Sequence, residues 1–179
     1  MHKVKTFHGL ILLSVLISIF TGIRFSHIGK DTEAYEAHFY NSSVVDGIYE
    51  RFEIGFALFM QLFSKTASTV EVFFAFVALI ITLVYLNTFT KIYSKCFVDG
   101  RASTNVLLIF FSLLLFSSWY LVATTNGLRQ GLSAVFLYWG CVEFVYERRK
   151  LKFLLLYAIA ITFHYSALLV IPFLLFYYL

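Results

Sequence analysis

The amino-acid sequence predicts an all-α, polytopic helical membrane protein with about five transmembrane helices. Composition is the first reason: of 179 residues, 60% are hydrophobic and 13% are charged, whereas about a quarter of the residues of a soluble domain carry charge. The second reason is that the chain has one proline and long runs of Phe, Leu and Ile, which favour uninterrupted helices. We expect a single membrane-embedded domain over residues 1–179.

Five segments are apolar enough to cross a bilayer, which takes about 20 residues of helix. They are roughly Phe7–Phe25, Val70–Thr90, Asn105–Thr124, Gly131–Tyr146 and Phe153–Tyr178. A sixth apolar segment, Ile54–Phe63, would form only about 15 Å of helix. We therefore expect it to be a short re-entrant or interfacial helix rather than a span.

Basic residues fall in three clusters that indicate the orientation of the chain. Cytoplasmic loops carry an excess of Lys and Arg, and all three clusters lie on one side when Ile54–Phe63 does not span. The N-terminus is therefore predicted to be cytoplasmic, and the net charge of +4 reflects orientation rather than nucleic-acid binding. The clusters are Lys3 with Lys5, then Lys91, Lys95 and Arg101, and finally Arg148, Arg149, Lys150 and Lys152.

Two polar segments then lie on the opposite, extracytoplasmic side. The first, Arg24–Glu53, holds three basic and six acidic residues. The second is the stretch Thr125-Asn126-Gly127-Leu128-Arg129-Gln130-Gly131 between two apolar runs. Charged residues at membrane depth are costly and mark functional sites by default. His164 lies about 16 Å into the last predicted span, so one site on the outer face can collect all three regions.

Arg129 is the main candidate in the second segment. Its guanidinium fork matches a phosphate or diphosphate, with Asn126 and Gln130 hydrogen-bonding nearby. The alternative is that Arg129 extends to lipid headgroups, while Gly127 and Gly131 allow a close helix contact. We expect the arginine to be functional and the glycines to serve packing.

Asp31 stands at the start of a predicted helix on which Tyr35 and Phe39 share one face. Its carboxylate can cap that helix, or it can act as a general base toward a sugar hydroxyl. The two roles are compatible, and the segment itself favours neither.

Glu53 and His164 each allow two interpretations. Glu53 either stabilises the positive end of the helix that follows it or faces Arg24 or Arg129 across a polar cavity. His164 is either a neutral histidine bonded to another helix or a group that transfers a proton or contacts phosphate. The sequence has no phosphate-binding glycine loop, metal-ligand spacing, serine nucleophile elbow or dinucleotide motif. We expect no cofactor and no metal.

Four groups of residues follow one another from the first predicted span to the last. They are Arg24 with Asp31 and Tyr35, then Glu53-Ile54-Gly55-Phe56, then Asn126-Gly127-Leu128-Arg129-Gln130-Gly131, and finally Phe163-His164-Tyr165-Ser166. In this order and topology they resemble the EpsG-like family of Wzy-type exopolysaccharide and O-antigen polymerases. The resemblance implies a multi-pass glycosyltransferase of the bacterial inner membrane that works at the outer leaflet without a metal. Family members are generally longer, so we expect the N-terminal part of a longer polymerase-like fold.

The predicted function is polymerisation of repeat units carried on undecaprenyl diphosphate, for exopolysaccharide, capsule or O-antigen synthesis. A glycan would pass from its diphosphate carrier to a hydroxyl of a second lipid-linked unit, and Asp31 is the favoured base. The bilayer, a chain-length regulator and a flippase are the further partners that the resemblance suggests. The residues assigned to catalysis are Arg129, Asp31, His164 and Glu53, and those assigned to substrate binding are Arg24, Tyr35, Asn126 and Gln130.

Two other functions remain open from the sequence. A transporter or flippase subunit for the same lipid-linked sugars would place Arg129 and His164 along a path across the membrane. A transporter would need polar residues at several depths across the membrane, whereas the polar residues of this sequence are predicted to lie on the outer side. A truncated membrane fragment without activity is the third interpretation.

Overall fold

The computed structural model describes residues 2–24, 28–29, 31–41, 52–66, 69–96 and 104–172. Some predicted features lie outside these ranges: Lys30, Asp46, Glu50 and Arg51 of the first polar segment, Arg101 of the second basic cluster, and residues 173–178 of the last predicted span. The described part is helical and contains no strand, which confirms the all-α prediction.

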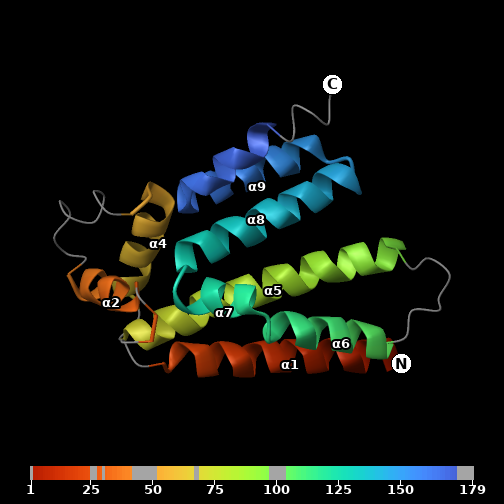
Figure 1. Ribbon diagram of the computed structural model, residues 1–179, viewed down its shortest axis with the longest axis horizontal. Helices are drawn as coiled ribbons and strands as arrows, with labels where there is room; N and C mark the ends of the chain where they lie inside the picture. The colour runs from red at the N-terminus through yellow and green to blue at the C-terminus, as the bar shows by residue number, and fades with distance from the viewer. Residues whose placement is uncertain are drawn as a thin grey trace.

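The helices are short at one end of the molecule and long elsewhere. The described elements are α1 (His2–Gly22), α2 (Thr32–Tyr40), α4 (Ile54–Ser64), α5 (Val70–Cys96), α6 (Thr104–Leu115), α7 (Ser118–Thr125), α8 (Leu128–Val145), α9 (Lys150–Phe163) and the 3₁₀ helix η1 (Tyr165–Val170). Helix α8 packs against α9 and α5, and α1 packs along α5. These four helices run along the long axis of the molecule (Figure 1).

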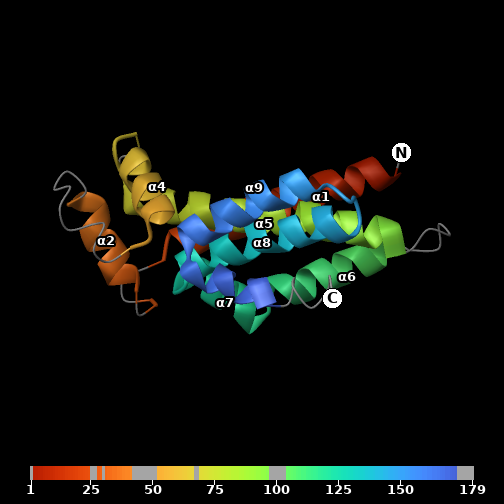
Figure 2. The same cartoon turned by 90° about the horizontal axis from the view of Figure 1, so that it is seen from above.

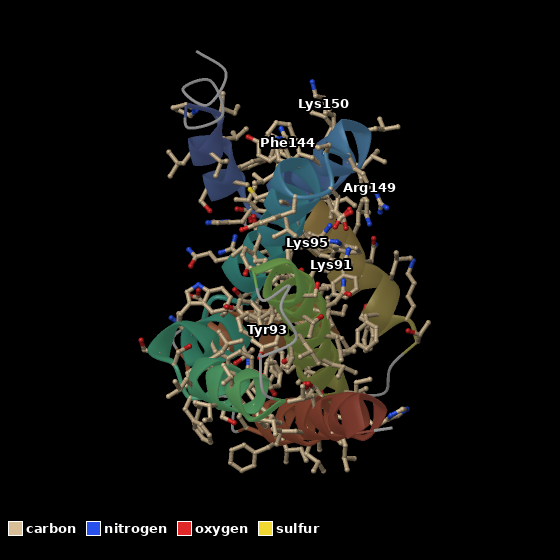
Figure 3. All side chains as sticks on the ribbon, turned by 90° about the vertical axis from the view of Figure 1, so that its right-hand side faces the viewer. Lys91, Tyr93, Lys95, Phe144, Arg149 and Lys150 are labelled. Atoms are coloured by element: carbon tan, nitrogen blue, oxygen red, sulfur yellow. The ribbon has the colours of Figure 1, made fainter. Side chains whose placement is uncertain are left out.

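Different helices and residues lie at the two ends of this bundle. Helices α2 and α4 gather where α1 and α9 finish and α8 begins (Figures 1 and 2); we call this the site end. The N-terminus, the last turns of α5 and the α8–α9 turn lie at the other end. We call it the basic end, because Lys91, Lys95, Arg149 and Lys150 lie there (Figure 3).

Helix α5 is the described helix that is long and apolar enough to cross a membrane. Its stretch Val70–Lys95 has 26 residues and a mean hydropathy of 2.3, whereas the apolar stretches His8–Gly22 and Ile54–Ser64 are shorter. The predicted count of five spans is therefore not confirmed. The short helix expected at Ile54–Phe63 is present as α4, with 11 residues.

Two of the predicted spans are each divided by a break in the helix. The segment Asn105–Thr124 forms α6 and α7, because Ser117 adopts an extended backbone and its hydroxyl accepts a hydrogen bond from the Tyr120 amide at 3.1 Å. The last predicted span leaves the α-helical conformation at His164, whose φ of −162° and ψ of 127° are those of extended backbone. Hydropathy predicted the apolar runs correctly but not these interruptions.

An aromatic cluster supports the site end from within. The Tyr35 ring lies 5.5 Å from the Phe52 ring and 5.4 Å from the Phe56 ring, measured between centroids. Phe56 in turn lies 6.1 Å from Phe73 of α5. All four side chains are buried, so they hold α2 and α4 onto the start of α5. The prediction that Tyr35 and Phe39 share one face of a helix is confirmed, and both residues are buried.

Gly55 allows α4 to approach α9. A Cβ atom at this position would lie 2.7 Å from the carbonyl oxygen of Thr162, a separation that forces backbone to move. Gly9 of α1 offers the opposite case, since nothing lies within 4 Å of its Cβ position.

We expect Gly55→Ala to lower the melting temperature of the purified chain in detergent, because overpacking of this kind costs about 1–3 kcal/mol. Gly9→Ala is the matched control and should leave it unchanged or raise it slightly, since Ala favours helix over Gly. Thermal unfolding followed by circular dichroism measures both. Equal melting temperatures for Gly55→Ala and the parent chain would contradict a tight α4–α9 contact.

Candidate functional site

Glu53 joins three segments that are far apart in the sequence. One carboxylate oxygen, Oε2, lies 2.7 Å from Nη1 of Arg129, and the other, Oε1, lies 2.5 Å from Nδ1 of His164. Arg129 is 76 residues and His164 is 111 residues further along the chain. The contact between Glu53 and Arg129, one of the two interpretations of Glu53 from the sequence, is present.

The start of α4 holds Glu53 in place. Glu53 is the N-cap residue, with extended backbone (φ −61°, ψ 145°), and its side chain makes no cap hydrogen bond. Its carbonyl oxygen accepts the Ala57 amide at 3.0 Å, which begins the helix. The carboxylate is thereby directed away from its own helix and toward α8 and α9.

The break after α9 positions His164. Phe163 stacks on Phe136 of α8 at 5.7 Å and lies 6.0 Å from Phe59 of α4, between ring centroids. Ser133 of α8 donates its hydroxyl to the His164 carbonyl oxygen at 3.3 Å. The last residues of α9 are thus fixed on both sides, and the imidazole points at Glu53.

Arg129 lies in the first turn of α8. Its guanidinium lies over the Phe52 ring, 5.0 Å from the centroid. Gly131 lets α8 pack tightly on α7, since a Cβ there would lie 2.5 Å from the Ala123 carbonyl oxygen. The packing interpretation of this glycine is therefore confirmed, and the packing fixes the turn that carries Arg129.

The side chains of Glu53, Arg129 and His164 differ in their exposure to solvent. The Glu53 side chain is 7% exposed, whereas Arg129 is 21% and His164 is 19% exposed. Burial alone would raise the pKa of Glu53, but its own backbone amide, Arg129 and His164 outweigh burial and hold the pKa below the ordinary value of 4.5. A ligand that reaches this end therefore meets the arginine and the histidine before the ionised carboxylate.

Arg24, which the sequence assigned to substrate binding, contacts backbone carbonyl groups. Its Nη1 donates to the carbonyl oxygens of Thr21 and Thr124 at 3.0 and 3.1 Å, and its Nη2 donates to that of Thr125 at 2.9 Å. The guanidinium also lies 4.2 Å from the Phe74 ring centroid. Arg24 therefore ties the end of α1 to the end of α7, and it supports the turn that precedes Arg129.

Asp31, Tyr35 and Asn126 support the same turn. The Asp31 amide donates to Oδ1 of Asn126 at 3.1 Å, and the Tyr35 hydroxyl donates to the Asn126 carbonyl oxygen at 3.4 Å. Asp31 is the N-cap residue of α2, but its carboxylate makes no cap hydrogen bond. Burial raises the pKa of Tyr35, although Arg129 nearby acts against this shift. Gln130 is exposed beside Arg129.

All eight predicted site residues thus lie at the site end, and two residues there were not predicted. Phe52 packs against both Tyr35 and Arg129, and Ser133 bonds the backbone of His164. Phe52 directly precedes Glu53, and Ser133 is a polar residue within a predicted span. These two features of the sequence could have identified Phe52 and Ser133 as members of the site. The catalytic and binding roles of the eight residues stay predictions.

The depressed pKa of Glu53 makes part of the stability dependent on pH. A carboxyl whose pKa is lower in the folded chain contributes stability above its unfolded pKa and loses it as the pH falls through the folded value. We expect the melting temperature of the parent chain to drop as the pH falls below 4.5, and that of Glu53→Gln, lower at neutral pH, to drop less. Parallel curves for the two chains would show that Glu53 is not stabilised in its ionised form.

The curated proteins and the solved structures gave no match. The model of the EpsG family matches residues 9–179, which include every residue of the Glu53, Arg129 and His164 site. The chain therefore belongs to the EpsG family, whose members are exopolysaccharide and O-antigen polymerase-like proteins.

Proposed function

We propose that the chain polymerises lipid-linked oligosaccharide repeat units and that Glu53, Arg129 and His164 form its reaction centre. Membership of the EpsG family supports a polysaccharide polymerase-like function. The observation that carries the proposal is the pairing of one buried carboxylate with an arginine of α8 and a histidine that follows α9. The histidine is suited to activate the acceptor, and the arginine is suited to stabilise the leaving group.

His164 serves as the general base in this proposal. Glu53 accepts from Nδ1, which favours the tautomer with the proton on Nδ1 and leaves Nε2 as the basic nitrogen. An acceptor sugar hydroxyl gives its proton to Nε2 while its oxygen forms a bond to the anomeric carbon of the donor. Glu53 then stabilises the positive charge that His164 gains. This assignment replaces Asp31, the base favoured by the sequence.

Arg129 stabilises the leaving group. The bond that breaks joins the anomeric carbon to the diphosphate oxygen, so negative charge develops on undecaprenyl diphosphate. A guanidinium has five N–H donors, and Glu53 engages one nitrogen of Arg129, so donors remain for phosphate oxygens. The exposed Gln130 is suited to orient the substrate. The turn that precedes Arg129 is held in position by Arg24, Tyr35 and Asn126.

The proposal includes an orientation in the bacterial inner membrane. The bundle would span the membrane several times, with the site end toward the extracytoplasmic face and the basic end in the cytoplasm, as the excess of Lys and Arg favours. An extracytoplasmic site would meet donor and acceptor in the same leaflet.

We expect Arg129→Ala and His164→Ala each to reduce polymer formation about a hundredfold or more, since each removes charge stabilisation or proton transfer in the transition state. The measurement is surface glycan profiling of a host strain whose own copy is deleted, complemented with each variant. The parent chain should restore the ladder of long polymers, and the two variants should leave single repeat units.

Gln61→Ala, a polar-to-apolar change further along α4, is the matched control and should restore the ladder. Immunoblots of the membrane fraction verify that all variants accumulate equally. A full ladder with Arg129→Ala at equal accumulation would refute the role of Arg129. A ladder unaffected by deletion of the gene would refute the polymerase itself.

A further inference from the structure

The basic end contains a second buried carboxylate, which the sequence analysis did not identify. Glu143 of α8 is 0% exposed. Its Oε1 atom accepts from Lys91 at 2.5 Å, from Lys152 at 2.9 Å and from the Trp139 indole at 2.8 Å. Arg149 lies 3.5 Å from Oε2. A carboxylate so enclosed holds three cations from α5, α9 and the α8–α9 turn within one small region.

The positive charge gathered here exceeds the negative charge. Besides the cations around Glu143, the described residues of this end include Lys95, Arg148 and Lys150, and Lys95 pairs with Glu147 at 3.4 Å. Among the described residues of α5, α8, α9 and the α8–α9 turn at this end, two carboxylates thus stand against six cations. The cationic side chains remain accessible: Arg149 is 59%, Lys95 50%, Lys152 36% and Lys91 31% exposed. Figure 3 looks onto this end, with Lys91, Lys95 and Arg149 near one another.

Exposed apolar side chains adjoin these cations along α9. Leu151 is 72%, Leu154 56% and Leu155 59% exposed. The Trp139 ring lies under Lys152, 4.8 Å from its Nζ to the centroid. A soluble anion would contact the cations but not the exposed leucines. A phospholipid can contact both, because it carries a phosphate and acyl chains.

We infer that the basic end binds the headgroup of an anionic glycerophospholipid, with the phosphate on Arg149, Lys152 and Lys91 and the acyl chains along the exposed leucines of α9. Basic pockets between membrane helices on the cytoplasmic side bind anionic headgroups in this way. Because two carboxylates leave an excess of positive charge, a headgroup with net negative charge is preferred to a zwitterionic one. Glu143 acts as the positioning residue that keeps the cations together.

The test measures lipid affinity by native mass spectrometry of the purified full chain. Phosphatidylglycerol and phosphatidylcholine with identical acyl chains are the two probes. We expect phosphatidylglycerol to bind at least about tenfold more tightly, and Arg149→Gln or Lys152→Gln to lower that affinity about fivefold each, since one basic residue near an anionic surface contributes on the order of a fivefold change. Their affinity for phosphatidylcholine should fall less, because its headgroup carries no net charge, and retained binding of this lipid verifies that the variants are folded.

Lys65→Gln is the matched control, because it removes one exposed lysine at the site end and should leave both affinities unchanged. Equal affinity of the parent chain for the two lipids would overturn the inference. A loss of phosphatidylglycerol affinity with Lys65→Gln as large as that with Arg149→Gln would also overturn it. Such a result would show that the lipid is attracted by overall positive charge and not by a specific site. Soluble glycerol 3-phosphate should not displace the lipid at equal concentration; displacement would assign the cations to a free phosphate compound instead.

Discussion

The burial of the Glu53 carboxylate is the constraint on which the arrangement of the site end depends. An ionised carboxylate with 7% of its side chain exposed is costly unless it is paired and hydrogen-bonded. Its two partners belong to α8 and to the residue after α9, so these elements must meet at the start of α4. Gly55 permits the close approach, and Phe163 fixes the last turn of α9. Folding and assembly of the candidate site are therefore one event.

The sequence predicted which residues lie at this end better than it predicted what they contact. Arg129 and His164 stand out because ionisable residues between apolar runs have few available partners, and both contact Glu53. Arg24 and Asn126, whose predicted role as substrate ligands stays a prediction, bond to backbone groups of other segments, and the sequence did not indicate these contacts. Backbone carbonyl and amide groups occur at every residue, so no pattern of side chains identifies such partners in advance.

The sequence analysis missed the helix breaks in two predicted spans for one reason. A hydropathy window measures average composition, and the stretches on both sides of Ser117 and His164 are largely apolar, so the average does not separate one long helix from two short ones. At Ser117 the hydroxyl satisfies an amide that the break leaves unpaired. At His164 the break turns a residue out of the helix and toward a carboxylate. Interrupted helices at membrane depth commonly border binding sites.

The two buried carboxylates show how similar chemistry leads to different consequences. Glu143 is fully enclosed, and its cations come from three elements, so removing any partner leaves the others to hold the same helices. Glu53 has two partners, and each is about one fifth exposed. A ligand at the site end can therefore compete for Arg129 and His164, whereas at the basic end Glu143 is fully buried and its partners Lys91, Arg149 and Lys152 are 31%, 59% and 36% exposed. The proposed reaction chemistry uses the end where the carboxylate has only two partners, and the proposed lipid contact uses the end where a fully buried carboxylate holds several accessible cations together.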